Sequence, residues 1–318
     1  MVRNTFQSVL DLMREYPDFN FTMSSARAYQ RIEEKYPDMF KQIEQRVKEG
    51  RWEVIGEMWV EPDLNMPDGE SLTRQILVGK RYFQSRFGVD VKIGWNPDSF
   101  GYNWQLPQIY RKSGMGYFVT QKLLWAHEFT TFPHKLFWWQ APDGSRLLTY
   151  FPHDYAGGID GPNMTKDLSL WAPAIYGPTL SDTPETMHLY GVGDHGGGPT
   201  RQMLDNAAAL ISPNIVYPRF ELGTATGFFD ELEKKLPDLN VPTWNGELYF
   251  QYHQGVFTTQ AETKRRIRRG EETLLNAEKL ASLALLDGRF YPQDELTRAW
   301  KRLLFDDFHA SCRAPGSA

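Results

Sequence analysis

Hydrophobic positions along this chain follow two spacings, one typical of helices and one typical of strands. Residues 6–16 place Phe6, Val9, Leu10 and Met13 on one helical face. Residues 89–95 alternate in the manner of a strand, and a helical pattern follows at 105–110. Further strands are predicted at 19–23, 52–56, 115–119, 187–191 and 215–220, with a hairpin formed by 137–140 and 146–151. Strands that alternate with helices predict an α/β fold with a parallel sheet or barrel.

The pattern changes after Gln260. A basic run at 263–269 leads into helical spacing that continues to Leu286, with no strand signal. We therefore predict an α/β domain over residues 1–255 and a partial helical domain over 256–318. The basic run suggests a polyanion partner, but a solvated helix face explains it better.

Composition narrows the class of protein. The net charge of −5 argues against a nucleic-acid partner. No apolar run approaches the roughly 20 residues that span a bilayer, and the sequence starts without a signal peptide. The single Cys312 suits a reducing cytoplasm. Aromatic residues make up 14% of the chain, which fits a carbohydrate enzyme and fits a large core equally well.

An aromatic turn after the strand at 89–95 carries the first candidate for chemistry. It reads Gly94-Trp95-Asn96-Pro97-Asp98-Ser99-Phe100-Gly101-Tyr102-Asn103. Asp98 therefore follows the carboxyl end of a strand, where reactive groups collect in α/β folds. An Asp in a turn is usually an ordinary helix cap. The flanking Trp95, Phe100 and Tyr102 favour a sugar site, because aromatic faces pack on pyranose rings.

A glycine-rich run from Gly193 to Thr200 follows another apolar strand. It lacks the lysine and the spacing of a phosphate loop. It is either a structural turn or a glycine-lined Asp194–His195 pair that a substrate can approach closely. A second carboxylate near Asp98 would complete the pair that glycoside hydrolysis needs.

Two further segments place polar side chains among aromatic ones. Glu247, Tyr249 and His253 lie within the aromatic run 246–255 and would need partners if buried. His309 ends the run Phe305-Asp306-Asp307-Phe308-His309. A single histidine is more often structural than a metal ligand, because ordinary hydrogen bonds satisfy both ring nitrogens.

Several of these motifs, taken in order, resemble the α-mannosidases of glycoside hydrolase family 38, and most closely the bacterial and cytosolic-vacuolar branch. The resemblance rests on residues 52–63, 69–72, 95–101, 193–200 and 253–260 and extends from residue 2 to about 309. It implies a seven-stranded β/α barrel, here without its first strand, followed by a helical middle domain. It also implies a retaining mechanism, a zinc ion, and an oligosaccharide or α-mannoside as substrate.

The resemblance assigns roles residue by residue. Asp98 matches the nucleophile, which also binds zinc, and His309 matches a zinc-binding histidine. Asp194 is the candidate general acid/base. The candidate substrate-binding residues are Trp95, Tyr102, Glu247, Tyr249 and His253. The resemblance implies no nucleic-acid or membrane partner, and it leaves a homo-oligomer open for the full-length family member.

Two departures from the family pattern matter. The His-x-Asp pair of the family's first strand, which supplies two zinc ligands, has no counterpart before His127, and Ala310 replaces the Asp that follows the zinc histidine. We therefore expect a fragment with weak zinc binding and little or no turnover. We also hypothesise that the residues after His309 are translated out of frame.

Two alternatives to an active α-mannosidase remain at this point. The chain is a non-catalytic remnant that keeps partial carbohydrate binding, or it belongs to another metal-dependent barrel class such as the polysaccharide deacetylases. The Asn-Pro-Asp-Ser-Phe-Gly segment at 96–101 argues against the deacetylases. Metal content and an activity assay distinguish an enzyme from a remnant.

Overall fold

The computed structural model describes residues 1–126, 132–177, 184–193, 196–212, 214–215 and 218–312. Its strands are β1 (Phe21–Met23), β2 (Trp52–Val54), β3 (Ile93–Trp95), β4 (Tyr117–Val119), β5 (Leu136–Gln140), β6 (Arg146–Tyr150) and β7 (Thr243–Asn245). Its α-helices are α1 (Val2–Glu15), α2 (Ala26–Lys35), α3 (Pro37–Lys48), α4 (Gly69–Phe87), α5 (Leu106–Lys112), α6 (Gly161–Tyr176), α7 (Arg201–Leu210), α8 (Ala225–Lys235), α9 (Ala261–Leu286) and α10 (Gln293–Asp306). The chain is therefore α/β, as predicted. No strand lies between its last two helices, α9 and α10.

The described strands form two sheets. β1 and β2 pair in parallel, while the larger sheet has the order β3-β4-β6-β5-β7. Strands β3, β4 and β6 are parallel, and the expected hairpin makes β5 antiparallel to β6. A single hydrogen bond from the Gly56 N–H to the Ile93 carbonyl (3.3 Å) joins the end of β2 to β3. The carboxyl ends of β2, β3 and β4 therefore lie close together.

The predicted seven-stranded β/α barrel, without its first strand, is not confirmed beyond its α/β class. The hairpin reverses β5, and β7 pairs in parallel with β5, so both run against β3, β4 and β6. β1 and β2 form a separate sheet. Strand β7 was not predicted, because its short Thr243–Asn245 segment carries too little alternation to be found from sequence.

Two other predicted strands are absent from the described residues. Residues 187–191 form only an isolated bridge, between Gly157 and Tyr190. The described part of 215–220 has no strand, and 216–217 lie outside the described residues. Met187 and Tyr190 pack against the hydrophobic clusters without a regular partner strand, which a hydrophobic pattern alone does not reveal.

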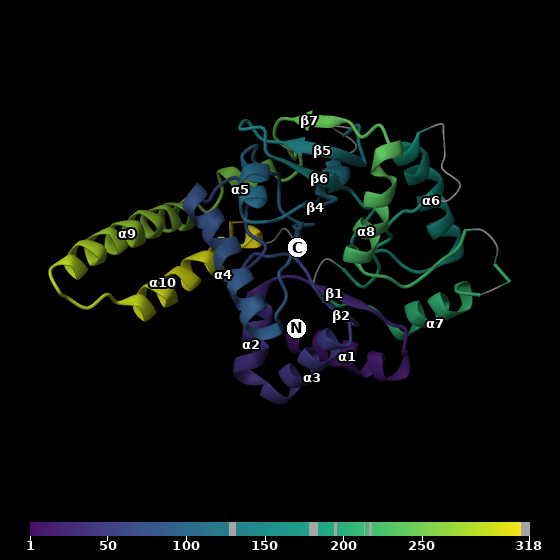
Figure 1. Ribbon diagram of the computed structural model, residues 1–318, viewed down its shortest axis with the longest axis horizontal. Helices are drawn as coiled ribbons and strands as arrows, with labels where there is room; N and C mark the ends of the chain where they lie inside the picture. Colours follow the sequence, from purple (N-terminus) through teal and green to yellow (C-terminus); the bar gives the residue numbers. More distant parts are fainter. Residues whose placement is uncertain (127–131, 178–183, 194–195, 213, 216–217, 313–318) are drawn as a thin grey trace.

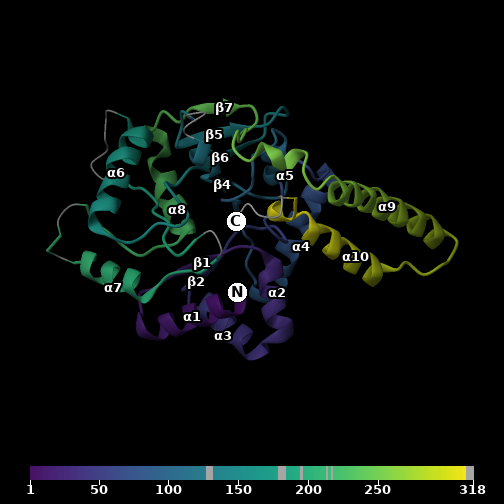
Figure 2. The same ribbon diagram turned by 180° about the vertical axis from the view of Figure 1, so that it is seen from behind.

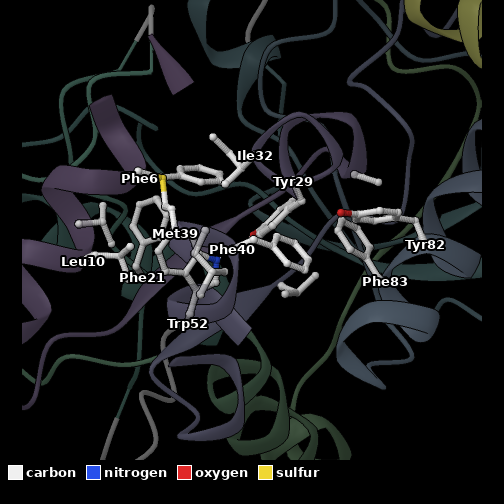
Figure 3. Close-up of a cluster of buried hydrophobic side chains, with 14 of the residues drawn as sticks. Phe6, Leu10, Phe21, Tyr29, Ile32, Met39, Phe40, Trp52, Tyr82 and Phe83 are labelled. Carbon is white, nitrogen blue, oxygen red and sulfur yellow. Dashed lines mark hydrogen bonds between the residues drawn. The ribbon is translucent and has the colours of Figure 1, made fainter. Parts of the chain in front are cut away.

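Three hydrophobic clusters hold the layers together. Aromatic rings on α1, α2, α4 and the first sheet form the cluster in Figure 3, where Phe6 and Trp52 meet edge to face at 5.1 Å. A second cluster lies beneath the aromatic turn and includes Tyr102, Tyr110 and Phe118. A third packs α6 and α8 against strands of the larger sheet. The helices of the third cluster lie beside that sheet in Figure 1.

Helices α9 and α10 form an antiparallel arm that projects from the body (Figures 1 and 2). Helix α4 anchors its base. Arg74 makes a bidentate ion pair with Glu278 (2.8 and 2.7 Å) and lies over the Trp300 ring. Gln75 donates to the Leu304 carbonyl (2.7 Å). These contacts fix the end of α10, from which the chain continues to His309.

Candidate active site

Loops that follow four strands and one helix meet at Asp98. Glu61 follows β2, Asp98 follows β3, Lys122 follows β4 and Tyr155 follows β6. His309 follows α10. The carboxyl edge of the parallel strands is therefore the edge that gathers polar side chains, as it does in α/β enzymes generally.

Both carboxylate oxygens of Asp98 have partners. The Lys122 Nζ donates to Oδ1 in a short contact, and the Tyr155 hydroxyl donates to the same oxygen at 3.3 Å. The Nε2 of His309 lies 3.0 Å from Oδ2. The Asp98 side chain is 27% exposed, whereas Lys122 is 2% exposed. A carboxylate that substrate can reach is thus held by groups that solvent barely reaches.

Charge and hydrogen bonding set the protonation of this group. Burial alone would raise the pKa of Asp98, but the His309 hydrogen bond and the charges of His309 and Lys122 hold it well below its usual range. Burial would lower the pKa of His309, yet Asp98 and Glu61 raise it above its ordinary value. Asp98 is therefore an ionised carboxylate at neutral pH, as a nucleophile requires.

The atoms of His309 and Asp98 that face each other show whether a zinc ion would fit between these two residues. The ring Nδ1 donates to the Glu61 carbonyl (2.9 Å), which leaves Nε2 facing Asp98. In a neutral ring, Nε2 and Oδ2 direct lone pairs at each other, and a cation between them satisfies both. Asp98 and His309 thus fit two ligand positions. A catalytic zinc takes three protein ligands, and the described residues contain no group of three suitable side chains.

Aromatic rings border Asp98 on two sides. Trp125 and Tyr155 stack with centroids 5.5 Å apart and an interplanar angle of 16°. Lys122 Nζ lies 3.8 Å from the Trp125 ring centroid, and Trp125 is 37% exposed. This partly open, flat surface beside a carboxylate is suited to contact the face of a sugar ring.

Phe100 joins two histidines on the other side. Its centroid lies 5.0 Å from the His253 ring and 5.4 Å from the His309 ring. His253 has a left-handed backbone with φ of 61°. Such a backbone is unfavourable outside glycine and often marks a functional site. Phe100 thus contacts the His253 ring on one side and, on the other, the His309 ring that contacts Asp98.

The other residues proposed from sequence lie at varied distances from this centre. Trp95 packs against the third hydrophobic cluster. Tyr102 is buried, and its hydroxyl contacts the Asn96 carbonyl (2.8 Å) and Thr120. Glu247 and Tyr249 are exposed, and Tyr249 accepts a hydrogen bond from Gln254. Asp194 and His195 lie outside the described residues.

Sequence reasoning missed Lys122, Trp125 and Tyr155. Lys122 comes directly after the predicted strand at 115–119, at the same edge as Asp98, so its position offered a signal. Trp125 and Tyr155 offered none, because their pairing depends on two loops, 30 positions apart in sequence, that meet in space. The sequence places Glu61 in the loop after the predicted strand at 52–56, but it does not show which groups Glu61 contacts, so no role could be assigned.

Comparison with family models assigns this α/β chain to the glycoside hydrolases. Residues 1–247 match the family model "Glycosyl hydrolases family 38 N-terminal domain", and residues 251–318 match "Alpha mannosidase middle domain". The chain belongs to glycosyl hydrolase family 38. The resemblance found in the motifs is thereby confirmed.

The curated relatives that the chain matches are named alpha-mannosidases. The chain is 37% identical to "Alpha-mannosidase" of Saccharomyces cerevisiae, covering 96% of this chain and 29% of the relative. It is 36% identical to "Alpha-mannosidase 2C1" of Homo sapiens, covering 95% and 28%. The crystal structure of an alpha-mannosidase from Enterococcus faecalis V583 has the same fold, with a TM-score of 0.80 at 20% identity over 98% of this chain and 36% of that chain. The chain therefore spans about 29% of the length of its yeast relative.

No helix among the described residues is both long enough and apolar enough to cross a membrane.

Proposed function

We propose that this chain performs the chemistry of a retaining α-mannosidase, which removes terminal α-linked mannose from oligosaccharides. The observation that carries the proposal is Asp98, a partly exposed carboxylate whose pKa is held low at the carboxyl edge of the sheet. Its contacts with Lys122 and His309 hold it ionised and oriented. Because the chain covers only part of its relatives, turnover by this chain alone belongs to the proposal.

The reaction takes two steps in the retaining mechanism. Asp98 attacks the anomeric carbon and forms a glycosyl ester, while the bond to the leaving oxygen breaks and that oxygen takes a proton from an acid. A water molecule then attacks the ester, gives its proton to the same group, and releases mannose and free Asp98. In both steps Lys122 balances the charge of the Asp98 carboxylate when it is free.

We propose Asp194 as the acid/base group. Its neighbour Gly193 lies so close to Tyr155 and Ala156 that an added Cβ would come within 2.4 Å of the Ala156 Cβ. Tyr155 in turn contacts Asp98. The start of this loop therefore lies beside the residue that touches the nucleophile, which supports the assignment.

We propose that zinc is the cofactor and that Asp98 and His309 would hold it. A bound zinc ion would bind sugar hydroxyls and stabilise the charge that develops in the reaction. The remaining ligand is not supplied by the described residues. For the substrate we propose Trp125 and Tyr155 as the sugar-facing surface, with Trp95, Glu247, Tyr249 and His253 as further contacts. Tyr102, which the sequence also proposed, is buried and supports the turn from beneath. We propose a cytoplasmic location because the chain has a single cysteine.

Asp98→Asn tests the proposal directly. We expect aryl α-mannoside hydrolysis to be lost, because a neutral amide cannot form the glycosyl ester. Asp90→Asn is the matched control, since Asp90 precedes the same strand, is half exposed, and forms its described ion pairs with Lys80 and Lys92, away from Asp98. The control keeps the wild-type rate. Hydrolysis by Asp98→Asn near the wild-type rate would remove Asp98 from the role, and mannoside binding without turnover in the wild type would favour the non-catalytic remnant.

A further inference from the structure

The turn that carries Asp98 lacks regular secondary structure, so its position depends on specific hydrogen bonds. Two of them end on one atom. The Oε1 of Glu61 accepts the backbone N–H of Asp98 at 2.6 Å and that of Ser99 at 3.1 Å. The Ser99 hydroxyl adds a bond to the Pro62 carbonyl (2.8 Å). The segment after β2 therefore holds the turn after β3.

The main chain of Glu61 holds the other side of the site. Its carbonyl accepts both the backbone N–H of His309 (3.2 Å) and the ring Nδ1 (2.9 Å). The pairing continues through an antiparallel bridge between Pro62 and Phe308. The His309 ring is thus fixed in both tautomer and orientation, with Nε2 directed at Asp98.

The side chain and the carbonyl of one residue thus hold the two groups that face each other across the site. This arrangement places a second carboxylate close to Asp98, which like-charge repulsion disfavours. Burial and the charge of Asp98 raise the pKa of Glu61 to about 7, while the charge of His309 and the hydrogen bond from the Asp98 amide oppose this rise. Removing the carboxylate would leave both amides without their acceptor.

We propose that Glu61 is the positioning residue of this active site, setting the placement of Asp98 relative to His309. The inference rests on the proposed function of Asp98, and it assigns Glu61 no contact with substrate. It differs from a general role in folding because it predicts local consequences. The turn loosens when the acceptor oxygen is lost and recovers when an isosteric acceptor replaces it.

Three variants of the full chain test this, with amide hydrogen exchange and steady-state kinetics as readouts. Glu61→Ala removes the acceptor, Glu61→Gln keeps one acceptor oxygen at the same reach, and Glu61→Asp keeps the charge but withdraws it by one methylene. Glu57→Gln is the matched control, since Glu57 is a buried carboxylate of the same segment. Circular dichroism and melting identify any variant that fails to fold.

We expect fast exchange of the Asp98 and Ser99 amides in Glu61→Ala and Glu61→Asp, with slow exchange in the wild type, Glu61→Gln and the control. On aryl α-mannosides we expect kcat to fall about 100-fold in Glu61→Ala at a similar KM, as misplacement of a reacting group does. Glu61→Gln restores most of this loss. If Glu61→Ala does not fold, Glu61→Asp gives the same comparison.

Slow exchange of both amides in folded Glu61→Ala or Glu61→Asp overturns the proposal, as does a Glu61→Gln variant impaired as severely as Glu61→Ala. The exchange readout is independent of turnover. If the wild type does not hydrolyse mannosides, the proposed function fails on that result, and exchange alone decides whether Glu61 holds the turn.

Discussion

Glu57 provides a quantitative test of the packing beneath the active site. It is fully buried where the segment after β2 passes under α4. Neither of its carboxyl oxygens makes a hydrogen bond of normal geometry within the described part of the chain, although its own backbone N–H and the Tyr110 hydroxyl lie close enough to lower its pKa in part. Burial raises the pKa of Glu57 from 4.5 to about 8, and the charge of Lys80 opposes this only in part.

The sign of the effect follows from linkage. Since the pKa in the folded state lies above that in the unfolded state, the stability from this group is fully present below pH 4.5 and is lost as the pH rises through about 8. At about 1.4 kcal/mol per pH unit, this interval corresponds to about 5 kcal/mol of unfolding free energy. Between pH 5 and pH 8 the expected loss is about 3–4 kcal/mol.

Glu57→Gln removes the titration and keeps the shape of the side chain. Urea unfolding at several pH values gives the free energy of unfolding for both proteins. We expect the variant to gain about 3–4 kcal/mol relative to the wild type between pH 5 and pH 8. Glu272→Gln, at an exposed position on α9, is the control and follows the wild type throughout. Parallel curves for Glu57→Gln and the wild type would refute the reasoning.

Three further predictions concern the support of the site and its chemistry. Gly79→Ala places a Cβ 2.0 Å from the Glu57 carbonyl oxygen, so we expect at least about 3 kcal/mol of destabilisation in urea unfolding. Gly69→Ala, with open space around it, should be nearly neutral, and equal effects would contradict the packing. Asp194→Asn should slow substrates with poor leaving groups more than activated ones, and equal slowing would reassign the acid. His309→Ala should weaken zinc affinity in a titration by more than the roughly 10–100-fold that loss of an outer-shell partner costs. His188→Ala, at a histidine bonded to Asp167, should leave zinc affinity unchanged.

The elements that could be predicted are those whose signal is local. The helix predicted at residues 6–16 shows its apolar face within a few turns, and it is present as α1 (Val2–Glu15). Asp98 was found because its turn follows a strand and is lined with aromatics. The hairpin of β5 and β6 was found because Asp143-Gly144 lies between two alternating runs.

The sheet order could not be predicted in the same way. Strands of three residues, such as β7, carry almost no periodic signal, and their pairing depends on which edge remains open after the others have formed. The strand predicted at 187–191 has suitable residues but finds only one bridge. Strand pairing depends on two segments that are distant in sequence, and the local pattern of either segment does not show which partner it will have.

The sequence by itself determined the family, the nucleophile candidate Asp98 and the histidine candidate His309, because each lies in a contiguous motif. Only the tertiary structure decided what surrounds them. Lys122 lies 24 positions from Asp98, Glu61 lies 37 positions away and His309 lies 211 positions away, yet all three contact it or its backbone. The physical reason is that ionisation and orientation of a carboxylate depend on charges and donors within a few ångströms, and only folding brings such distant segments that close.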